Sequence, residues 1–461
     1  MAFPTMGVPD TGDTAWMLIS SALVMLMVPG LAFFYGGMVR AKGVLNMMMM
    51  SMSAMGVVGV LWVLYGYSES FGEDKGFLIG DPTQFFGLRD LIGGNGAATS
   101  VGPKTEVKIA LVGTVPATVF VVFQLMFAII TVALISGAVA DRMRFGPWLL
   151  FAGLWATIVY FPVAHWVFSF DGVSAADGGW IANKLKAIDF AGGTAVHINA
   201  GAAALVLALV LGKRRGWPKE PMRPHNLPFV MLGSGLLWFG WYGFNAGSAT
   251  SSNGTAGTTF VTTTVATCAG MLAWLLTERL RDGHATSLGA ASGIVAGLVA
   301  ITPSCSSVNV VGALAIGVAA GVLCALAVGL KYKVGLDDAL DVVGVHLVGG
   351  VVGTLMVGLV AAPEAPAAVK GLFYGGGVDQ LWRQAVGVGA VLAYSLVCTA
   401  IIAYVLKFTI GLRADEEAEM IGIDESEHAE SAYDFAPQRG GGLGQPKPNA
   451  IPVAAAAGKE A

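Results

Sequence analysis

The chain has 461 residues, of which 55% are hydrophobic and only 12% are charged, and its mean hydropathy is +0.70. Soluble domains carry about 25% charged residues, so this composition excludes a soluble protein and indicates an integral membrane protein. The net charge of −4 does not point to any class of partner. Apolar segments recur along the chain, which predicts one membrane domain at 1–408 rather than a soluble domain with an anchor.

Eleven apolar segments are long enough to cross the roughly 30 Å of hydrocarbon in a bilayer, which takes about 20 helical residues. In chain order they are predicted near 14–37, 43–66, 109–137, 147–169, 190–212, 228–250, 256–277, 285–303, 308–330, 340–362 and 384–408. Their length favours helices over the strands of a membrane barrel, whose signal is about ten alternating residues. The predicted fold is therefore an all-α polytopic membrane protein with eleven transmembrane helices.

Basic residues gather in the odd-numbered loops between these segments. They are Arg40 and Lys42; Arg142 and Arg144; Lys213, Arg214, Arg215, Lys219 and Arg223; Arg279 and Arg281; Lys331 and Lys333; and Lys407 and Arg413. The loops on the other side are uncharged or mix acidic and basic residues. Because cytoplasmic loops carry the excess of Lys and Arg, the N-terminus is predicted outside the cytoplasmic membrane and the C-terminus in the cytoplasm.

Two segments are expected to lie outside the membrane. The loop at 67–108 is long and rich in glycine. Residues 409–461 form the predicted cytoplasmic tail, which begins with the acidic stretch "GLRADEEAEMIGIDESEHAESAYDF", typical of a region that contains helices. The remainder is rich in Gly, Pro and Ala and is predicted to be disordered from about 437.

A spaced pair of residues occurs twice along the chain. The fifth segment begins with Asp189 and carries His197 eight residues later, and the tenth begins with Asp338 and carries His346 at the same spacing. Each pair lies five segments into its half of the chain, at 14–212 and 228–362, so the two helices run in opposite directions. This pattern predicts an inverted repeat of five plus five helices, with 384–408 as an extra helix, and inverted repeats share a site near the bilayer midplane.

The spacing brings the two histidines toward the same depth. Eight residues at 1.5 Å each place each imidazole about 12 Å inside its own end of the membrane. A neutral imidazole has one donor and one acceptor nitrogen, so a pair can share a hydrogen and contact a small solute without a fixed charge. One such histidine alone could simply bond a neighbouring helix, but the symmetric pair of His197 and His346 favours a functional site.

A second set of residues is suited to a small cation. Phe244 and Ser248 lie four residues apart and so on one helix face, and the third segment carries Gln124 between Phe123 and Phe127. Phenyl faces attract cations, and a serine oxygen can accept hydrogen bonds from them. The alternative is that these phenylalanines are core residues and that the serine lets helices approach.

The aspartates that open the two histidine segments have two interpretations. Asp189 adds negative charge on the side of Ser248, and it could equally cap the free backbone N–H groups at its helix start. Both interpretations can hold together. Asp338 and Asp341, at the start of the tenth segment, carry the same ambiguity.

Other chemistry-bearing residues have simpler explanations. The run "NMMMMSMSAM" could suggest a thioether path for copper, but four consecutive methionines point all round a helix, which favours packing. His165 is more typical of a structural residue. The cysteines Cys268, Cys305, Cys324 and Cys398 lack a metal-ligand spacing. The sequence contains no nucleotide-binding loop or catalytic triad, so we predict a protein that is not an enzyme and has no cofactor.

Several long motifs resemble those of one family. They are "VPGLAFFYGGMVRAKGVLNMMM", "FQLMFAIITVALISGAVADRMRF", "DFAGGTAVHINAG", "PHNLPFVMLGSGLLWFGWYGFNAGS" and "DDALDVVGVHLVGG". Together they resemble the Amt branch of the Amt/Mep/Rh ammonium transporters, and the likeness extends over about residues 14–435. The resemblance implies a homotrimer of eleven-helix subunits, each with its own pore, that carries ammonium or ammonia, with methylammonium as an analogue.

The resemblance also implies roles for particular residues. Phe127 and Phe244 match the stacked pore phenylalanines, Ser248 the recruitment serine, His197 and His346 the twin pore histidines, and Asp189 the structural or recruiting aspartate. The implied mechanism is that ammonium binds outside, loses a proton near the phenylalanine gate, and crosses as ammonia. In many members the proton is thought to cross too, with the histidines as a relay.

One position departs from the family pattern. Two residues after "PVAHW" the family usually has a tryptophan that helps to hold ammonium, and contiguous alignment places Phe168 there. A longer loop follows and ends in "GGW", so Trp180 is an alternative for that role. The sequence leaves open which of the two aromatic residues belongs to the recruitment site.

The resemblance further implies partners and leaves alternatives for function. The tail resembles the family region that contacts a neighbouring subunit, and in bacteria PII-type signal proteins commonly dock on that face. Membrane lipid is expected around the helices, and no nucleic acid is expected. The leading hypothesis is an ammonium transporter or channel; the alternatives are an ammonium sensor that signals through its tail and a channel for neutral gas.

Overall fold

The computed structural model describes residues 3–92, 98–101 and 104–433. The N-terminal half contains α1 (Thr11–Met38), α2 (Val44–Leu61), α3 (Tyr67–Phe71), α4 (Ala117–Ile135), α5 (Phe145–Trp155), α6 (Phe161–Phe168) and α7 (Asn199–Leu211). The C-terminal half contains α8 (Leu227–Asn245), α9 (Gly254–Asp282), α10 (Ser287–Ile301), α11 (Val310–Val334), α12 (Val348–Val360) and α13 (Asp379–Thr409). The tail adds α14 (Glu416–Ile421) and α15 (Ile423–His428).

Short turns of other pitch extend several of these helices. The wider π-helical segments are η2 (Trp62–Gly66), η5 (Ala156–Tyr160), η6 (Ile181–Leu185), η7 (Gly193–Ile198) and η9 (Val343–Leu347). The tighter 3-10 turns are η1 (Ala41–Gly43), η3 (Phe86–Leu88), η4 (Ser136–Val139), η8 (Ala246–Ala249) and η10 (Leu372–Tyr374). Single π-helical turns often occur at functional positions, and η7 and η9 are the segments that carry His197 and His346.

The protein is a helical, multi-pass membrane protein. Ten helical segments of the described chain are long and apolar enough to cross a bilayer, and they follow ten of the predicted segments closely. The remaining predicted segment, 285–303, which is the eighth in chain order, corresponds to α10, an apolar helix of only 15 residues. Eleven crossings and the direction of insertion therefore stay predictions.

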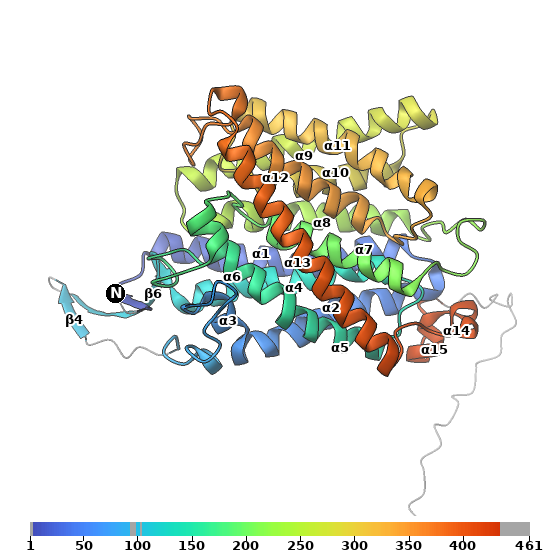
Figure 1. The fold of residues 1–461 in the computed structure, drawn as a ribbon, viewed down its shortest axis with the longest axis horizontal. Coiled ribbons are helices and arrows are strands. Elements are labelled where there is room, and N and C mark those ends of the chain that lie inside the picture. Colours follow the sequence, from blue (N-terminus) through green and yellow to red (C-terminus); the bar gives the residue numbers. More distant parts are fainter. Residues whose placement is uncertain (1–2, 93–97, 102–103, 434–461) are drawn as a thin grey trace, which may run out of the picture.

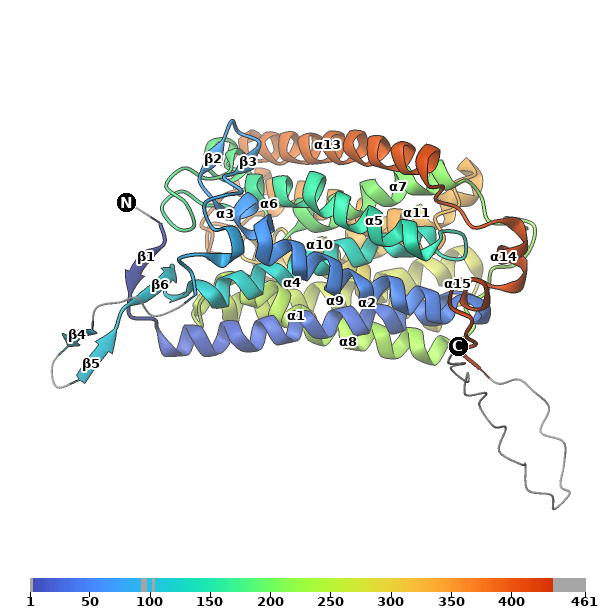
Figure 2. The same ribbon diagram turned by 90° about the horizontal axis from the view of Figure 1, so that it is seen from below.

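The helices run side by side along the length of one bundle (Figure 1). The N-terminus and the strands lie at one end of the bundle, which we call the N-terminal end, and α14 and α15 lie at the opposite end, the tail end (Figure 2). α1 packs along α8, which brings the two halves of the chain together, and α13 crosses obliquely over α7 and α12. Small residues allow the close approach: a Cβ on Gly37 would lie 2.6 Å from the Asn226 carbonyl oxygen.

Two predicted boundaries are wrong. Residues 109–116, predicted as the start of a membrane helix, form strands β6 (Ile109–Val112) and β7 (Val115–Pro116) instead. Gly113 turns the chain between them with φ at +60°, and Pro116, which has no N–H, has the extended backbone of a helix cap. The loop predicted to begin at 67 also begins later, because the helix continues to Phe71.

Small sheets cover the N-terminal end. β1 (Thr5–Gly7) pairs antiparallel with β6, with Met6 opposite Ala110, and β6 pairs with β7. β2 (Asp74–Lys75) pairs with β3 (Ile79–Gly80), and β4 (Ala98–Val101) with β5 (Lys104–Val107). The sheet of β1, β6 and β7 and the hairpin of β2 and β3 lie beside the helix ends, and the hairpin of β4 and β5 extends away from the bundle (Figure 2).

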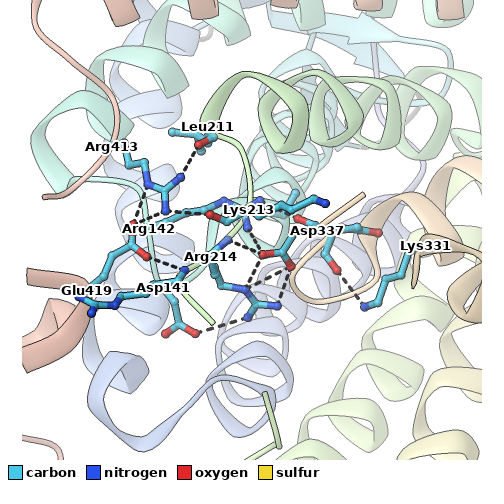
Figure 3. Close-up of polar contacts among 12 residues, drawn as sticks. Asp141, Arg142, Leu211, Lys213, Arg214, Lys331, Asp337, Arg413 and Glu419 are labelled. Atoms are coloured by element: carbon cyan, nitrogen blue, oxygen red, sulfur yellow. Dashed lines mark hydrogen bonds and ion pairs between the residues drawn. The ribbon is translucent and has the colours of Figure 1, made fainter. Parts of the chain in front are cut away.

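Buried charges join the connections at the tail end (Figure 3). Asp337 accepts hydrogen bonds from Arg142 Nη1 at 2.9 Å and from Arg214 Nη2 at 2.8 Å, and the side chains of Arg142 and Asp337 have no exposed surface. Arg214 also contacts Asp141, which is paired with Arg40 at 2.9 Å. Burial lowers the pKa of Arg142 to about 10 even though Asp337 favours its charged form.

The described part of the tail packs onto the tail end of the bundle. Asp424 accepts hydrogen bonds from the backbone N–H groups of Leu45 and Asn46 at 2.9 and 2.7 Å, so it caps the start of α2. Lys42 in turn donates to the carbonyl oxygen of Met420 at 2.6 Å, near the end of α14. The predicted disorder from about 437 falls outside the residues that the structure describes.

Candidate functional site

Two phenylalanine rings pack against each other in the interior of the bundle. Phe127 on α4 and Phe244 on α8 have ring centroids 4.4 Å apart with planes inclined by 38°, and both rings are buried. They come from opposite halves of the chain, which the packing of α1 on α8 and α4 brings together. The rings must move for a solute to pass between the spaces on either side of them.

A cavity of about 120 Å³, which we call the aromatic cavity, lies between this pair of rings and the N-terminal end of the bundle. Its walls include Gln124, Phe127, Phe168 and Ser248, which are residues that the sequence assigns to recruitment or places on the same face. The Phe168 ring lies 6.4 Å from the Phe127 ring. Ser248 donates its hydroxyl hydrogen to the Phe244 carbonyl oxygen at 2.7 Å, which leaves the lone pairs of its oxygen available as acceptors.

The two histidines lie on the other side of the phenylalanine pair. His197 Nδ1 and His346 Nδ1 are 3.2 Å apart, and their rings stack at a centroid distance of 5.3 Å. A hydrogen bond at this distance needs one N–H donor and one bare nitrogen, so the neutral rings hold one shared hydrogen between the Nδ1 atoms. The structure thus brings together two residues that are 149 positions apart in the sequence.

The histidines line a very small space. Its volume is about 10 Å³, and apart from the imidazoles its walls are almost entirely apolar, with Phe244, Leu31 and Val295 among them. Such a volume holds roughly one water molecule. His197 Nε2 is buried and has no hydrogen-bond partner among the described residues, so it is available to a solute in this space.

Buried aspartates fix the starts of both histidine segments. Asp189 accepts hydrogen bonds from the backbone N–H groups of Gly192, Gly193 and Thr194 at 2.8, 2.6 and 2.7 Å. Asp338 makes the corresponding contacts to Val342 and Val343 at 3.1 and 2.7 Å. Both carboxylates therefore cap the segment that carries a histidine, which is the structural interpretation of these residues.

Asp189 also borders a second, larger space. A cavity of about 710 Å³ lies next to the aromatic one, and Asp189 contributes to its wall. Phe170, Phe190 and Ser248 line both cavities and so lie between them. Asp189 does not line the aromatic cavity, so its carboxylate lies beside that cavity rather than within it.

Trp180, the alternative to Phe168 for the recruitment site, does not line the aromatic cavity in this structure, and its role stays a prediction. Among the described residues that line the aromatic cavity Trp180 is absent, because its ring packs against Trp166 at 5.8 Å. Phe170 and Ser174, from the same long loop, line the cavity instead. Sequence reasoning missed them, and the only signal was the length of the loop that follows Phe168.

Trp241 is a further residue that the sequence analysis missed. Its ring stacks on His197 at 5.4 Å, and its Nε1 donates to Thr302 Oγ1 at 2.9 Å. Trp241 precedes Phe244 by three residues, so both rings lie on one face of α8. That spacing, present in the motif "WFGWYGFNAG", could have identified it.

His165 has a different environment from the paired histidines. Its Nδ1 lies 3.1 Å from the Ser70 carbonyl oxygen and its Nε2 lies 3.0 Å from Asp74 Oδ1. The first contact ties α6 to α3 and the second ties it to β2. The methionine run points around α2, with Met47 and Met50 buried and Met49 and Met52 exposed.

Comparisons with known proteins agree on one family. The model of the Ammonium Transporter Family matches residues 15–433. The chain is 74% identical to an ammonium transporter of Mycobacterium tuberculosis over 441 residues, which cover 94% of this chain and 92% of the relative. The crystal structure of Saccharomyces cerevisiae Mep2 is similar with a TM-score of 0.78 at 35% identity, covering 89% of this chain and 88% of Mep2. A structure described as a Sensor Amt Protein is similar with a TM-score of 0.80 at 28% identity, covering 90% and 98%.

Proposed function

Because this chain belongs to the Ammonium Transporter Family, we propose that it takes up ammonium nitrogen through the path between its two cavities. Ammonium is recruited in the aromatic cavity, loses a proton at the Phe127–Phe244 pair, and crosses as ammonia past His197 and His346. The observation that carries this proposal is the imidazole pair, which lies in a nearly dry apolar space beyond a closed aromatic gate.

The aromatic cavity supports the recruitment step. Ring faces attract a cation within about 6 Å of their centres, and Phe127 and Phe168 present rings to this space. Ser248 offers an oxygen that can accept an N–H from ammonium. Asp189 contributes negative charge from the adjoining cavity. A small cation can therefore exchange water for these contacts at the mouth of the path.

The narrow space beyond the gate supports deprotonation. An ion held among apolar side chains pays a large desolvation cost, whereas neutral ammonia pays little. The contact between His197 and His346 provides a chain of proton-binding nitrogens along the same space. We propose that the released proton follows this chain, so that each ammonia is accompanied by a proton and transport is electrogenic.

The same proposal includes the arrangement in the membrane. The protein crosses the cytoplasmic membrane eleven times as two inverted halves, 14–212 and 228–362, with α13 as the additional helix. The N-terminal end faces outward and the tail end faces the cytoplasm, where most of the basic loops lie. Three copies assemble as a homotrimer, and a PII-type protein can dock on the cytoplasmic face.

Current on a solid-supported membrane tests the function directly. Proteoliposomes that contain the wild-type protein should give an inward current when they receive a pulse of ammonium. Alkalinisation inside the vesicles without a current would identify conduction of neutral gas instead. Ammonium binding without either signal would favour a sensor, the class named for one of the similar structures.

Removing the Ser248 hydroxyl should weaken recruitment. We expect Ser248→Ala to raise the KM for methylammonium by about tenfold, the effect of one lost hydrogen bond to a charged group, with the maximal rate little changed. Uptake of radiolabelled methylammonium measures both constants. The matched control is Ser234→Ala on the same helix, whose hydroxyl bonds the Met231 carbonyl oxygen and does not line the cavity. Equal KM values for the two variants would contradict the role of Ser248.

A larger ring at position 168 should strengthen recruitment. Trp is the best cation-binding aromatic side chain, so we expect Phe168→Trp to lower the KM for methylammonium by about threefold. The cavity of about 120 Å³ beside Phe168 provides room for the larger ring. The same uptake assay measures the change, and Phe86→Trp, at an exposed site in the first long loop, is the control. An unchanged or higher KM would mean that Phe168 does not face the ion.

A further inference from the structure

Gln384, on the helix outside the repeat, has every hydrogen-bonding position of its amide occupied. Its side chain is fully buried on α13. Oε1 accepts from the Ile188 backbone N–H at 2.6 Å and from Gln380 Nε2 at 3.0 Å. Nε2 donates to the carbonyl oxygens of Ile188 at 2.6 Å and Thr354 at 3.1 Å. Because a glutamine amide offers two donor and two acceptor positions, the group is saturated.

The Gln384 amide hydrogen-bonds both the backbone N–H and the carbonyl oxygen of a single residue, Ile188. The next residue is Asp189, which caps the segment that carries His197. Then comes Phe190, whose side chain lines both the aromatic cavity and the larger one. On its other side this short segment is held by the hydrogen bond from Phe190 N to the Pro303 carbonyl oxygen, at 3.1 Å. The positions of Asp189 and Phe190 therefore depend on contacts at 188 and 303.

Neighbouring residues of α13 extend the same contact. Arg383 Nη1 donates to the Leu185 carbonyl oxygen at 2.9 Å, and Gln380 Nε2 approaches the Lys186 carbonyl oxygen at 3.4 Å. The start of α13 thus binds the backbone of residues 185–188. Through Thr354 the Gln384 amide also joins this segment to α12, the helix that follows the His346 segment.

We propose that Gln384 is a positioning residue for ammonium recruitment: it fixes residues 188–190 so that Asp189 and Phe190 keep their places beside the aromatic cavity. The inference rests on the proposed transport function. Gln384 does not line the aromatic cavity, so it acts through the segment and not by contact with the ion. Loss of the hydrogen bonds between Gln384 and Ile188 should weaken binding of the cation more than it slows passage through the pore.

Methylammonium uptake by Gln384→Leu tests this inference in the full-length protein. Leucine keeps the bulk but leaves the Ile188 and Thr354 groups without their partner. We expect the KM to rise by about tenfold with less than about a twofold change in maximal rate. The matched control is Ser395→Ala, which removes another fully buried hydrogen bond from the same helix, to the Asn199 carbonyl oxygen at 3.0 Å. Its KM should equal that of the wild type.

A second background separates positioning from a general structural effect. If Gln384 acts through Phe190, then Gln384→Leu in a Phe190→Ala protein should add about twofold or less to the KM, because effects within one contact chain are not additive. An unchanged KM, a fall in maximal rate at constant KM, or full additivity with Phe190→Ala would overturn the proposal. A wild-type protein without ammonium-dependent uptake would instead refute the transport function.

A second substitution at position 384 keeps the test decisive if Gln384→Leu does not fold. Gln384→Glu keeps the acceptor for the Ile188 N–H but turns an oxygen toward the two carbonyl groups, so its KM should also rise. If Gln384→Leu does not reach the membrane, the KM of Gln384→Glu tests the prediction instead. If neither variant reaches the membrane, Gln384 is a folding residue and the proposal is overturned.

Discussion

The double variant His197→Ala with His346→Ala should lose the ammonium-driven current while it keeps its fold. The two imidazoles are the polar groups that line the narrow space beyond the gate, and proton transfer by a positioned side chain commonly contributes at least about a hundredfold. We therefore expect a current reduced by about a hundredfold or more on a solid-supported membrane. Ammonia itself needs no charged partner in an apolar space, so alkalinisation of the vesicle interior after an ammonia pulse should persist.

The control for this experiment is His284→Ala. That histidine is exposed in the connection between α9 and α10, so its loss should change neither signal. A double variant that still carries the wild-type current would show that the proton crosses without the histidines. Loss of both the current and the alkalinisation, in protein of normal size-exclusion profile, would show that the pair is needed to keep the path open.

Replacing Asp337 should have the largest effect on stability. Asn at this position cannot balance the two guanidinium groups of Arg142 and Arg214, which lie in the protein at 0% and 4% side-chain exposure. Breaking a buried ion pair by removing one partner costs about 3–5 kcal/mol. We expect Asp337→Asn to unfold at a clearly lower temperature in detergent micelles, followed by intrinsic tryptophan fluorescence. The control, Asp282→Asn, removes the exposed partner of Arg281 and should leave the unfolding temperature unchanged.

The stability difference between the wild type and Asp337→Asn should depend on pH. Burial raises the pKa of Asp337, but hydrogen bonds from Arg214 and the charges of Arg214 and Arg142 outweigh burial and hold the pKa below 3.8. A carboxyl group with a lowered pKa in the folded state stabilises the protein above its unfolded pKa and loses that contribution as the pH falls through the folded value. The difference between wild type and Asp337→Asn should thus be full at neutral pH and shrink below about pH 4. A constant difference would mean that the carboxylate charge is not what matters.

Repeated local patterns made part of the site predictable. The spacing from Asp189 to His197 and from Asp338 to His346 is a property of two short stretches, and helical geometry converts it into depth. The structure brings the two histidines into contact, as that argument expects. The face shared by Phe244 and Ser248 follows from the same local geometry.

Other features depend on partners that are distant in the sequence. Arg142 and Arg214 entered the sequence analysis only as positive charges on one side, yet they meet Asp337 across 195 and 123 positions. Phe170 and Ser174 line the aromatic cavity because of how the long loop after Phe168 folds, which no local pattern in the sequence indicates. The strands at 109–116 look like a membrane segment because their residues are apolar, and pairing with β1 decides their conformation.

The small volume around the paired imidazoles has a consequence for proton leakage across the membrane. With room for roughly one water molecule, it cannot hold the continuous file of water along which protons hop freely. Under the proposed mechanism, a proton crosses this space along the imidazole nitrogens of His197 and His346 and not along water. If transport follows the proposed mechanism, protons enter through this protein only as fast as ammonium is supplied, so many copies in one membrane add no separate proton leak.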